Sequence, residues 1–155
     1  MHATARTILC PTDASPTSEA AVPVAYRLAA DGGQVHLLHV VQPPMLGNPI
    51  YPPYEQGYVP SAEETRAGKA AVRAALERLV PADAAARGIA TGFHLVDAAN
   101  PSMAIADAFA SLGADLVVMG THGRSGFVRF ALGSVASDVM KRKLPAVLVY
   151  QPPSD

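Results

Sequence analysis

Apolar residues along this chain fall into short β-rich runs separated by longer stretches with helical spacing. The short runs cover residues 7–10, 35–41, 91–96, 115–119 and 146–150. Between them, apolar positions recur every three or four residues, which is the spacing of an amphipathic helix. Strands that alternate with helices form βαβ units, whose parallel sheet is covered on both faces. The pattern therefore predicts an α/β fold: a doubly wound, five-stranded parallel sheet in a single domain spanning residues 1–155.

The stretch after the first strand carries the start and stop signals of a helix. Ser15 suits the N-cap and Pro16 the first turn, while Gly32 and Gly33 suit its end. Pro23 lies inside this helix, and a proline there removes a backbone donor and crowds the preceding turn, so we expect a kink or a later start. Helical spacing predicts a buried face made of Ala21, Val24, Ala25 and Leu28.

Three further helices are marked by similar local signals. Ser61 and Glu64 have the spacing of a capping box. Asn100 and Pro101 suit the cap and the first position of a third helix. Ser134 is expected to cap a fourth helix, whose last turn is basic and so complements the negative end of the helix dipole.

Charge and cysteine content restrict the function classes. The chain has 12 Lys and Arg against 13 Asp and Glu, a formal charge of −1, so no global field draws it to nucleic acid or an anionic membrane. Any anion site must be local. Cys10, the single cysteine, cannot form an internal disulfide, and its apolar neighbours predict a buried, inert thiol. No run resembles a secretion signal or a membrane span, which favours a cytoplasmic location.

Residues 42–60 form a long connection rich in proline and tyrosine. Such composition resists regular structure without specifying a partner, so a mobile connection is favoured over a proline-rich ligand for another domain.

Glycines cluster between the fourth strand and the fourth helix, in the pattern Gly120-x2-Gly123-x9-Gly133-Ser134. Glycine lets backbone approach a ligand closely, and the start of a helix offers amide donors without backbone partners. These donors, the helix dipole and the Ser134 hydroxyl predict a phosphate cradle. The alternative is a surface turn followed by an ordinary cap. The sequence lacks the motif of a P-loop NTPase and the first-strand motif of a dinucleotide site.

This glycine pattern resembles the signature of the universal stress protein family, specifically of its ATP-binding branch. The resemblance extends to ILCPTDAS at 8–15, LHVV at 38–41 and GADLVVMG at 113–120, and it covers nearly the whole chain except the 42–60 loop. It implies a flavodoxin-like, adenine nucleotide alpha hydrolase-like sheet with strand order 3-2-1-4-5. It also implies ATP as the ligand, with Mg²⁺ or Mn²⁺ accompanying the phosphates, and a homodimer closed by the last strand.

A strand order of 3-2-1-4-5 places the winding reversal between the first and fourth strands, where such sheets bind their ligands. The resemblance therefore implies a site assembled from the loops that follow these two strands. Adenine and ribose are expected near Pro11, Thr12, Asp13, Val40, Met119 and Gly120, and phosphates near Gly123, Gly133, Ser134 and Val135.

Other polar residues have more than one interpretation. Asp13 suits ribose hydroxyls or an adenine amine, but it also suits a local bond to loop amides. Arg124 and Arg129 could screen phosphate charge or be solvated loop residues. His122 lacks a recognisable acidic partner, so catalysis there is disfavoured.

Two histidines lie on the second predicted strand, and three residues depart from the family pattern. His36 and His39 face opposite sides of a strand and cannot easily share a metal, so we interpret them as structural. The departures are Pro23, Ala14 where glycine is frequent, and Asn100 where glycine often stands. Only Pro23 is expected to alter the backbone path.

The leading functional hypothesis is a nucleotide-dependent regulatory or stress-response switch that binds ATP with little or no turnover. Slow ATP hydrolysis or phosphoryl transfer, a nucleotide-independent interaction module, and a flavin-binding flavodoxin-like protein are the alternatives. The physiological signal and the protein partner are not predicted by the sequence.

Overall fold

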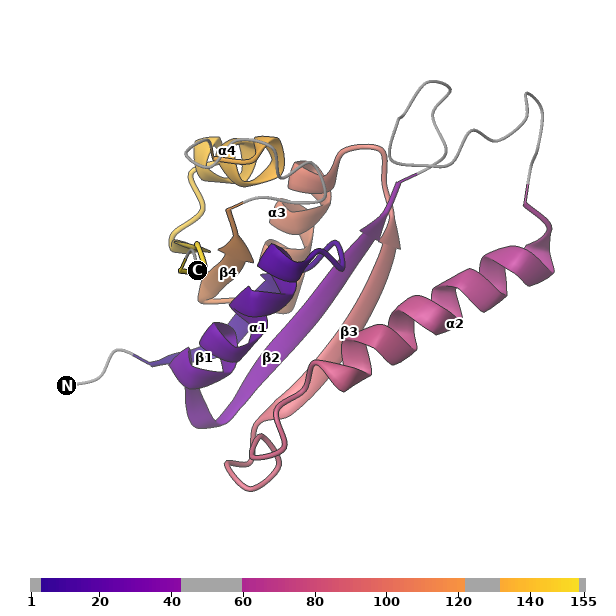
Figure 1. Cartoon of the computed structure of the whole chain (residues 1–155). Coiled ribbons are helices and arrows are strands. Elements are labelled where there is room, and N and C mark those ends of the chain that lie inside the picture. Colours follow the sequence, from indigo (N-terminus) through magenta and orange to yellow (C-terminus); the bar gives the residue numbers. More distant parts are fainter. Residues whose placement is uncertain (1–3, 43–59, 122–131, 154–155) are drawn as a thin grey trace.

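The structure, a computed structural model, describes residues 4–42, 60–121 and 132–153. Strands and helices alternate, and the strands pair in parallel in the order β3-β2-β1-β4-β5 (Figure 1), as predicted. The elements are β1 (Ala5–Pro11), α1 (Pro16–Leu28), β2 (Ala29–Val41), α2 (Ala62–Arg78), β3 (Ala90–Asp97), α3 (Pro101–Leu112), β4 (Leu116–Gly120), α4 (Ser134–Lys141) and β5 (Val147–Tyr150).

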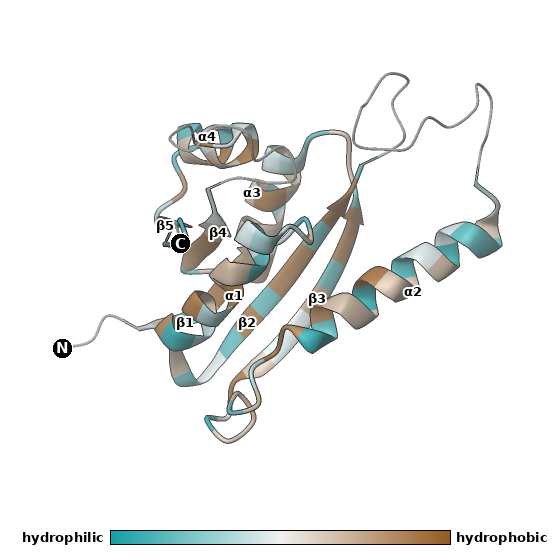
Figure 2. Cartoon of the chain, viewed as in Figure 1, coloured by the Kyte–Doolittle hydropathy of each residue, from teal (hydrophilic) through white to brown (hydrophobic). Residues whose placement is uncertain are grey.

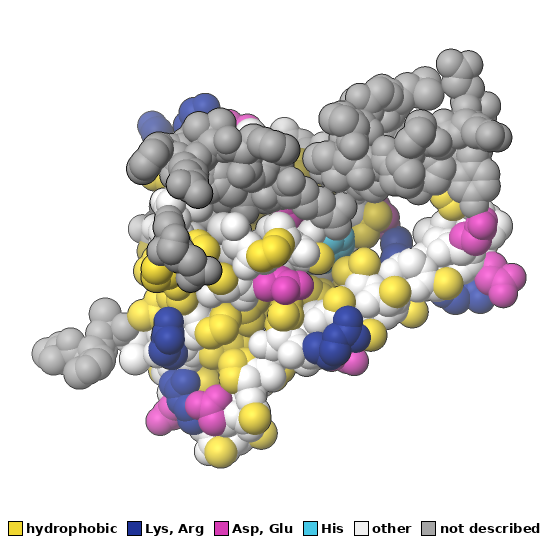
Figure 3. Space-filling model, in the orientation of Figure 1, with side chains coloured by type: hydrophobic (Ala, Val, Ile, Leu, Met, Phe, Trp, Pro, Cys, Tyr) yellow, Lys and Arg dark blue, Asp and Glu magenta, His cyan; other side chains and the backbone are white. Residues whose placement is uncertain are grey.

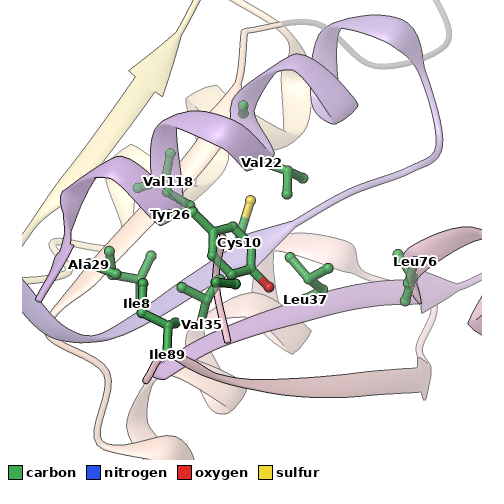
Figure 4. Packing of buried hydrophobic residues seen from close by; sticks show 13 residues of the cluster. Ile8, Cys10, Val22, Tyr26, Ala29, Val35, Leu37, Leu76, Ile89 and Val118 are labelled. Atoms are coloured by element: carbon green, nitrogen blue, oxygen red, sulfur yellow. The ribbon is translucent and has the colours of Figure 1, made fainter. Parts of the chain in front are cut away.

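Hydrophobic side chains cover both faces of this sheet, because neighbouring residues of a strand point to opposite sides. Ile8 and Cys10 of β1 pack on one face with Tyr26 of α1 and Leu76 of α2 (Figure 4). Leu9, between them, packs on the other face in the cluster formed with α3 and α4. In Figure 2, hydrophobic segments run along β2, β3 and β4. This two-sided burial is what the uninterrupted apolar runs in the sequence predict.

Three of the helices begin with the side-chain caps that the sequence predicts. The Ser15 hydroxyl accepts from the Ser18 amide at the start of α1. Ser61 and Glu64 form a complete capping box at α2, and Asn100 caps α3 through its side-chain oxygen. Each cap satisfies a backbone donor that the first helical turn leaves unpaired, so each fixes a helix start locally.

The end of α1 differs from the prediction. The helix stops at Leu28 rather than at Gly32 and Gly33, and β2 begins directly at Ala29, which pairs with Ala5. Arg87 donates to the Tyr26 and Ala29 carbonyls, at 2.7 Å each, and so satisfies acceptors at the helix end. A contact with a residue far along the chain thus ends the helix earlier than the glycine signal does.

The expected buried face of the first helix is also corrected. The buried face of α1 is rotated from the expected one: Val24 and Leu28 are only partly buried, whereas Val22 and Tyr26 are buried. Pro23 is exposed within α1, and the helix starts no later because of it.

The fourth helix also begins differently. Gly133 is the N-cap of α4, and Ser134 is the first helical residue and makes no side-chain capping bond, so the expected Ser134 cap is wrong.

On the face of the molecule that carries α1 and α2, positive and negative side chains are interspersed around a hydrophobic stripe (Figure 3). This mixture fits the small formal charge of −1. Among the described helices, none combines the length and the apolar character needed to cross a membrane.

Candidate functional site

The loop between β1 and α1 is organised around the hydroxyl of Ser18. This hydroxyl donates to Asp13 Oδ1 at 2.8 Å, lies 2.9 Å from Thr12 Oγ1, and accepts from the Ser15 hydroxyl at 3.1 Å. Asp13 Oδ1 also accepts from the Ser15 amide at 3.0 Å. Thr12, Ser15 and Ser18 are buried. The local role that the sequence allowed for Asp13 is therefore present, and the carboxylate is oriented by the first turn of α1.

Ala14, in the same loop, has a left-handed backbone with φ of 61°. An L-residue other than glycine pays about 1–2 kcal/mol for that conformation. Ala14 stands where the resemblance leads one to expect glycine, so the substitution carries a conformational cost that the sequence analysis did not assign to it.

The carboxyl end of β4 lies directly against the start of α1. A Cβ placed on Gly120 would be 2.8 Å from the Thr17 carbonyl oxygen and 3.1 Å from the Ser18 Cα. These are backbone atoms, so only glycine allows this close approach. β1 and β4 also pair through Ile8 with Leu116. The two loops that the sequence predicts to form one site therefore leave the same edge of the sheet from adjacent strands.

The start of α4 presents unpaired backbone donors near this edge. The Gly133 amide donates to the Thr121 carbonyl, and the Thr121 amide donates to the Tyr150 carbonyl, which ties the helix start to β4 and β5. The amides of Ser134 and Val135 follow in the first turn, and they bond to no acceptor within the described residues. The positive end of the helix dipole adds to these donors, so the chemistry favours an anion.

The apolar residues expected at the site share one hydrophobic cluster. Met119 is buried in the cluster formed with α3 and α4, and Val40 and Val135 pack against it while remaining partly exposed. They therefore provide an apolar surface on the α4 side of the sheet.

A cavity of about 240 Å³ lies on the other side of the β1–α1 loop, toward α2. Thr12, Ala14, Glu19 and His39 line it together with apolar side chains of α2. His39 is buried, and its Nδ1 lies 2.9 Å from the Thr12 carbonyl oxygen. Because a carbonyl only accepts, this ring nitrogen is the protonated one. His39 thus fastens the loop to β2, in the structural role predicted for it.

His36 points to the opposite face of β2, where its Nδ1 lies 3.0 Å from His94 Nε2. Burial, followed by the neighbouring His94, lowers the pKa of His36; burial, followed by the charge of Arg73, lowers the pKa of His94. The expectation that His36 and His39 do not share a site is confirmed. Within the described residues, no group of three or more His, Cys, Asp or Glu side chains could hold a metal ion.

Burial also raises the pKa of Cys10 to about 12, so its thiol is inert near neutral pH.

The sequence profile of the universal stress protein family matches residues 4–150. The chain belongs to this family. Comparison with curated proteins gave no match.

Solved structures agree with this assignment of the universal stress protein fold. The hypothetical protein MJ0577 is 23% identical with a TM-score of 0.69, and the alignment covers 100% of both chains. A universal stress protein family member from Burkholderia pseudomallei is 28% identical with a TM-score of 0.67, over 94% of this chain and 95% of that one. A universal stress protein in complex with cAMP is 23% identical with a TM-score of 0.64, over 95% and 97%.

The residues that the family resemblance assigns to a ligand separate into three groups in this universal stress protein fold. Pro11, Thr12 and Asp13 lie at the end of β1 and in the following loop, next to Gly120 across the start of α1. Gly133, Ser134 and Val135 form the start of α4. Gly123 and Arg124, with His122 and Arg129, lie outside the described residues, as does most of the 42–60 loop.

Sequence reasoning missed Ser18, whose hydroxyl connects most of the β1–α1 loop. A signal was present, because Ser15 and Ser18 occupy the N-cap and N3 positions of a recognisable helix start. The contact with Asp13 depends on how the loop turns back, which helical spacing does not encode.

Proposed function

We propose that this chain binds an adenine nucleotide, ATP in particular, reversibly at the carboxyl edge of β1 and β4. The observation that carries the proposal is the pair of amides at the start of α4, those of Ser134 and Val135, which bond to no acceptor in the part of the chain that the structure describes. Such donors at the positive end of a helix suit a phosphate chain. The cAMP complex of a related universal stress protein supports an adenine nucleotide as the ligand class.

In this proposal the phosphates lie on Gly133, Ser134 and Val135, with Gly123 and Arg124 completing the contacts by resemblance to the family. Mg²⁺ or Mn²⁺ is held through the phosphates, because a triphosphate supplies the oxygen ligands that these cations prefer.

The nucleoside lies in this proposal toward β1 and β2. Asp13 is oriented by Ser18 and accepts from the ribose or the adenine amine, with Pro11 and Thr12 beside it. Val40, Met119 and Gly120 supply the apolar and close-packed surface.

Binding rather than turnover is the proposed output. Rapid hydrolysis needs a group that positions water as well as groups that stabilise developing charge. Helix-start amides stabilise phosphate charge but cannot remove a proton. Asp13, which the Ser15 amide and the Ser18 hydroxyl orient, is assigned in this proposal to the nucleoside and not to the phosphates. We therefore propose a nucleotide-dependent regulatory or stress-response switch in the cytoplasm.

Calorimetric titration of nucleotide-stripped protein with ATP and Mg²⁺ tests the proposal, and Ser134 offers a matched pair of variants. Ser134→Pro deletes both the amide donor and the hydroxyl at N1, where proline is well tolerated in a helix. Ser134→Ala deletes only the exposed hydroxyl. Loss of one charge-assisted bond of about 1.5–3 kcal/mol weakens ATP binding at least tenfold in Ser134→Pro. Ser134→Ala keeps the amide, so it should weaken ATP binding less than Ser134→Pro does, and the difference between the two variants measures the amide alone.

Wild-type protein that binds no ATP, with Mg²⁺ or with Mn²⁺, would contradict the proposal. If Ser134→Pro and wild type bind ATP with equal affinity, the Ser134 amide at the start of α4 does not contact the phosphates. Phosphate release followed in the same samples tests the absence of turnover, which fails if release exceeds the background of a no-protein control.

We also propose a homodimer closed through β5. This strand ends the sheet beside β4, and residues 147–150 are all only partly buried. An edge strand presents unpaired backbone groups that a second copy can pair with. Sedimentation at micromolar concentration should show a dimer, and a monomer alone would contradict this part.

A further inference from the structure

We propose that His36 and His94 form a binding site for a divalent transition metal ion, Zn²⁺ or Cu²⁺, on the open side of β2 and β3. The site lies on the sheet face away from α1 and α2. It is independent of the proposed nucleotide site, which lies at the carboxyl edge of β1 and β4.

The position of the two rings follows from the register of neighbouring strands. His36 pairs with Gly92 and His94 pairs with Leu38, so the two histidines lie on one face of β2 and β3 and two residues apart along it. These strands run side by side over their length (Figure 1). Gly92 has no side chain, and a Cβ there would overlap His36 Nδ1 and lie 3.0 Å from His94 Nε2. The glycine therefore leaves the space in which the ring nitrogens meet.

The distance between the ring nitrogens is close to that of a metal-bridged pair. His36 Nδ1 and His94 Nε2 are 3.0 Å apart. Two nitrogens bound to Zn²⁺ at about 2.0–2.1 Å in tetrahedral geometry are about 3.3–3.4 Å apart. Chelation requires an opening of a few tenths of an ångström and a rotation of both partly buried rings, so that the two nitrogen lone pairs point at a common position instead of lying along one hydrogen bond.

Gln34 completes the arrangement expected around a metal-binding histidine. Its Oε1 lies 3.2 Å from His36 Nε2 and can only accept, so this nitrogen carries the proton and Nδ1 has the free lone pair. Metal-binding histidines usually donate their second N–H to such an acceptor, which fixes the ring and its tautomer. His94 Nε2 then donates to His36 Nδ1 in the metal-free protein.

Metal binding replaces this shared proton. The proton on His94 Nε2 moves through water to its own Nδ1, both imidazoles stay neutral, and no net proton is released. Water molecules fill the remaining coordination positions, as imidazole and water are suitable ligands for Zn²⁺ and Cu²⁺. Arg73 lies near His94 and its charge opposes a cation, but its Nε is paired with Glu77 Oε1 at 3.0 Å.

Calorimetric titration of tag-free, full-length protein with ZnCl₂ near neutral pH tests the site. We expect one Zn²⁺ per chain. His36→Asn and His94→Gln each keep an amide near the ligating nitrogen but remove the imidazole, and each should weaken binding at least tenfold. Gln34→Ala removes only the acceptor behind His36 and should weaken binding by roughly tenfold or somewhat less. His2→Asn and His122→Asn are the controls, because these histidines could bind Zn²⁺ elsewhere, and they should bind within twofold of wild type.

A second measurement uses wild-type protein alone, so that it does not depend on the folding of any variant. Cu²⁺ bound at the site should show electron spin echo modulation from two imidazole nitrogens, and Zn²⁺ should shift the ¹⁵N resonances of His36 Nδ1 and His94 Nε2. The proposal is overturned if wild-type protein binds no Zn²⁺, or if His2→Asn or His122→Asn abolishes binding while His36→Asn does not. Cu²⁺ signals from a single imidazole would overturn it as well.

Discussion

Replacing Ser18 by alanine tests whether the β1–α1 loop depends on one hydroxyl. The Ser18 hydroxyl contacts Asp13 Oδ1 at 2.8 Å, Thr12 Oγ1 at 2.9 Å and Ser15 Oγ at 3.1 Å, and it is buried. A bond to a charged acceptor contributes about 1.5–3 kcal/mol, and each neutral bond about 0.5–1.5 kcal/mol. Because bonds in one network are not additive, we expect Ser18→Ala to lower the free energy of unfolding by about 2–4 kcal/mol.

Urea unfolding measures this loss directly. With a slope of about 1–3 kcal/mol per molar urea, the midpoint should fall by about 1–2 M at unchanged slope. Ser111→Ala is the matched control, since the Ser111 hydroxyl is exposed and donates only to the Ala108 carbonyl. Its midpoint should stay near that of wild type. A double-mutant cycle that combines Ser18→Ala with Asp13→Asn should give a coupling free energy between the two residues of about 1 kcal/mol or more. Equal midpoints for Ser18→Ala and Ser111→Ala would refute the reasoning.

Two further substitutions and the buried thiol of Cys10 give additional predictions. Ala14→Gly should raise the free energy of unfolding by about 0.5–1 kcal/mol in the same urea assay, because φ of 61° favours glycine; a loss of stability would contradict this. Gly120→Ala should lower it by about 1–3 kcal/mol, since the new Cβ meets the Thr17 carbonyl oxygen at 2.8 Å, and a neutral result would show that the backbone moves freely. With the Cys10 pKa raised from 9.0 to about 12, the unfolded thiol ionises first, so this contribution to stability is complete below pH 9 and is lost as the pH rises toward 12. Ellman's reagent should therefore leave Cys10 unmodified in native protein at pH 8 and react rapidly in urea, and rapid native reaction would contradict its burial.

The sequence predicted the features of the fold that depend on local signals. Alternation of apolar runs gave the strands, and side-chain caps such as Ser15 and Asn100 gave helix starts, because each cap bonds an amide only three residues away. The end of α1 was wrong, since it depends on Arg87, which reaches the Tyr26 carbonyl from 61 positions away. No local pattern contains that contact.

The candidate site was predicted from a motif, and the structure shows what the motif leaves open. Motif spacing put Gly120 at the end of β4, but the reason for glycine there is the Thr17 backbone of another element. Ala14 looked interchangeable with glycine in the sequence, and only its φ of 61° in the structure reveals the cost. The expected Ser134 cap was wrong because Gly133 takes the N-cap position. Ser134 is instead the first helical residue, so it offers its backbone amide at the helix start and its hydroxyl does not cap the helix.

The two proposed sites both involve β2, and the alternation of its side chains separates them. His39 reaches Thr12 on the face toward α2, and His36 reaches His94 on the opposite face. Leu37 and Leu38, between the two histidines, are fully buried on opposite faces of the sheet, so no polar path connects the two rings along the strand. His36→Asn should therefore weaken Zn²⁺ binding at least tenfold while ATP affinity stays within twofold of wild type. If ATP affinity falls together with Zn²⁺ affinity, the two sites are coupled through the sheet, and the separation argued from strand geometry is wrong.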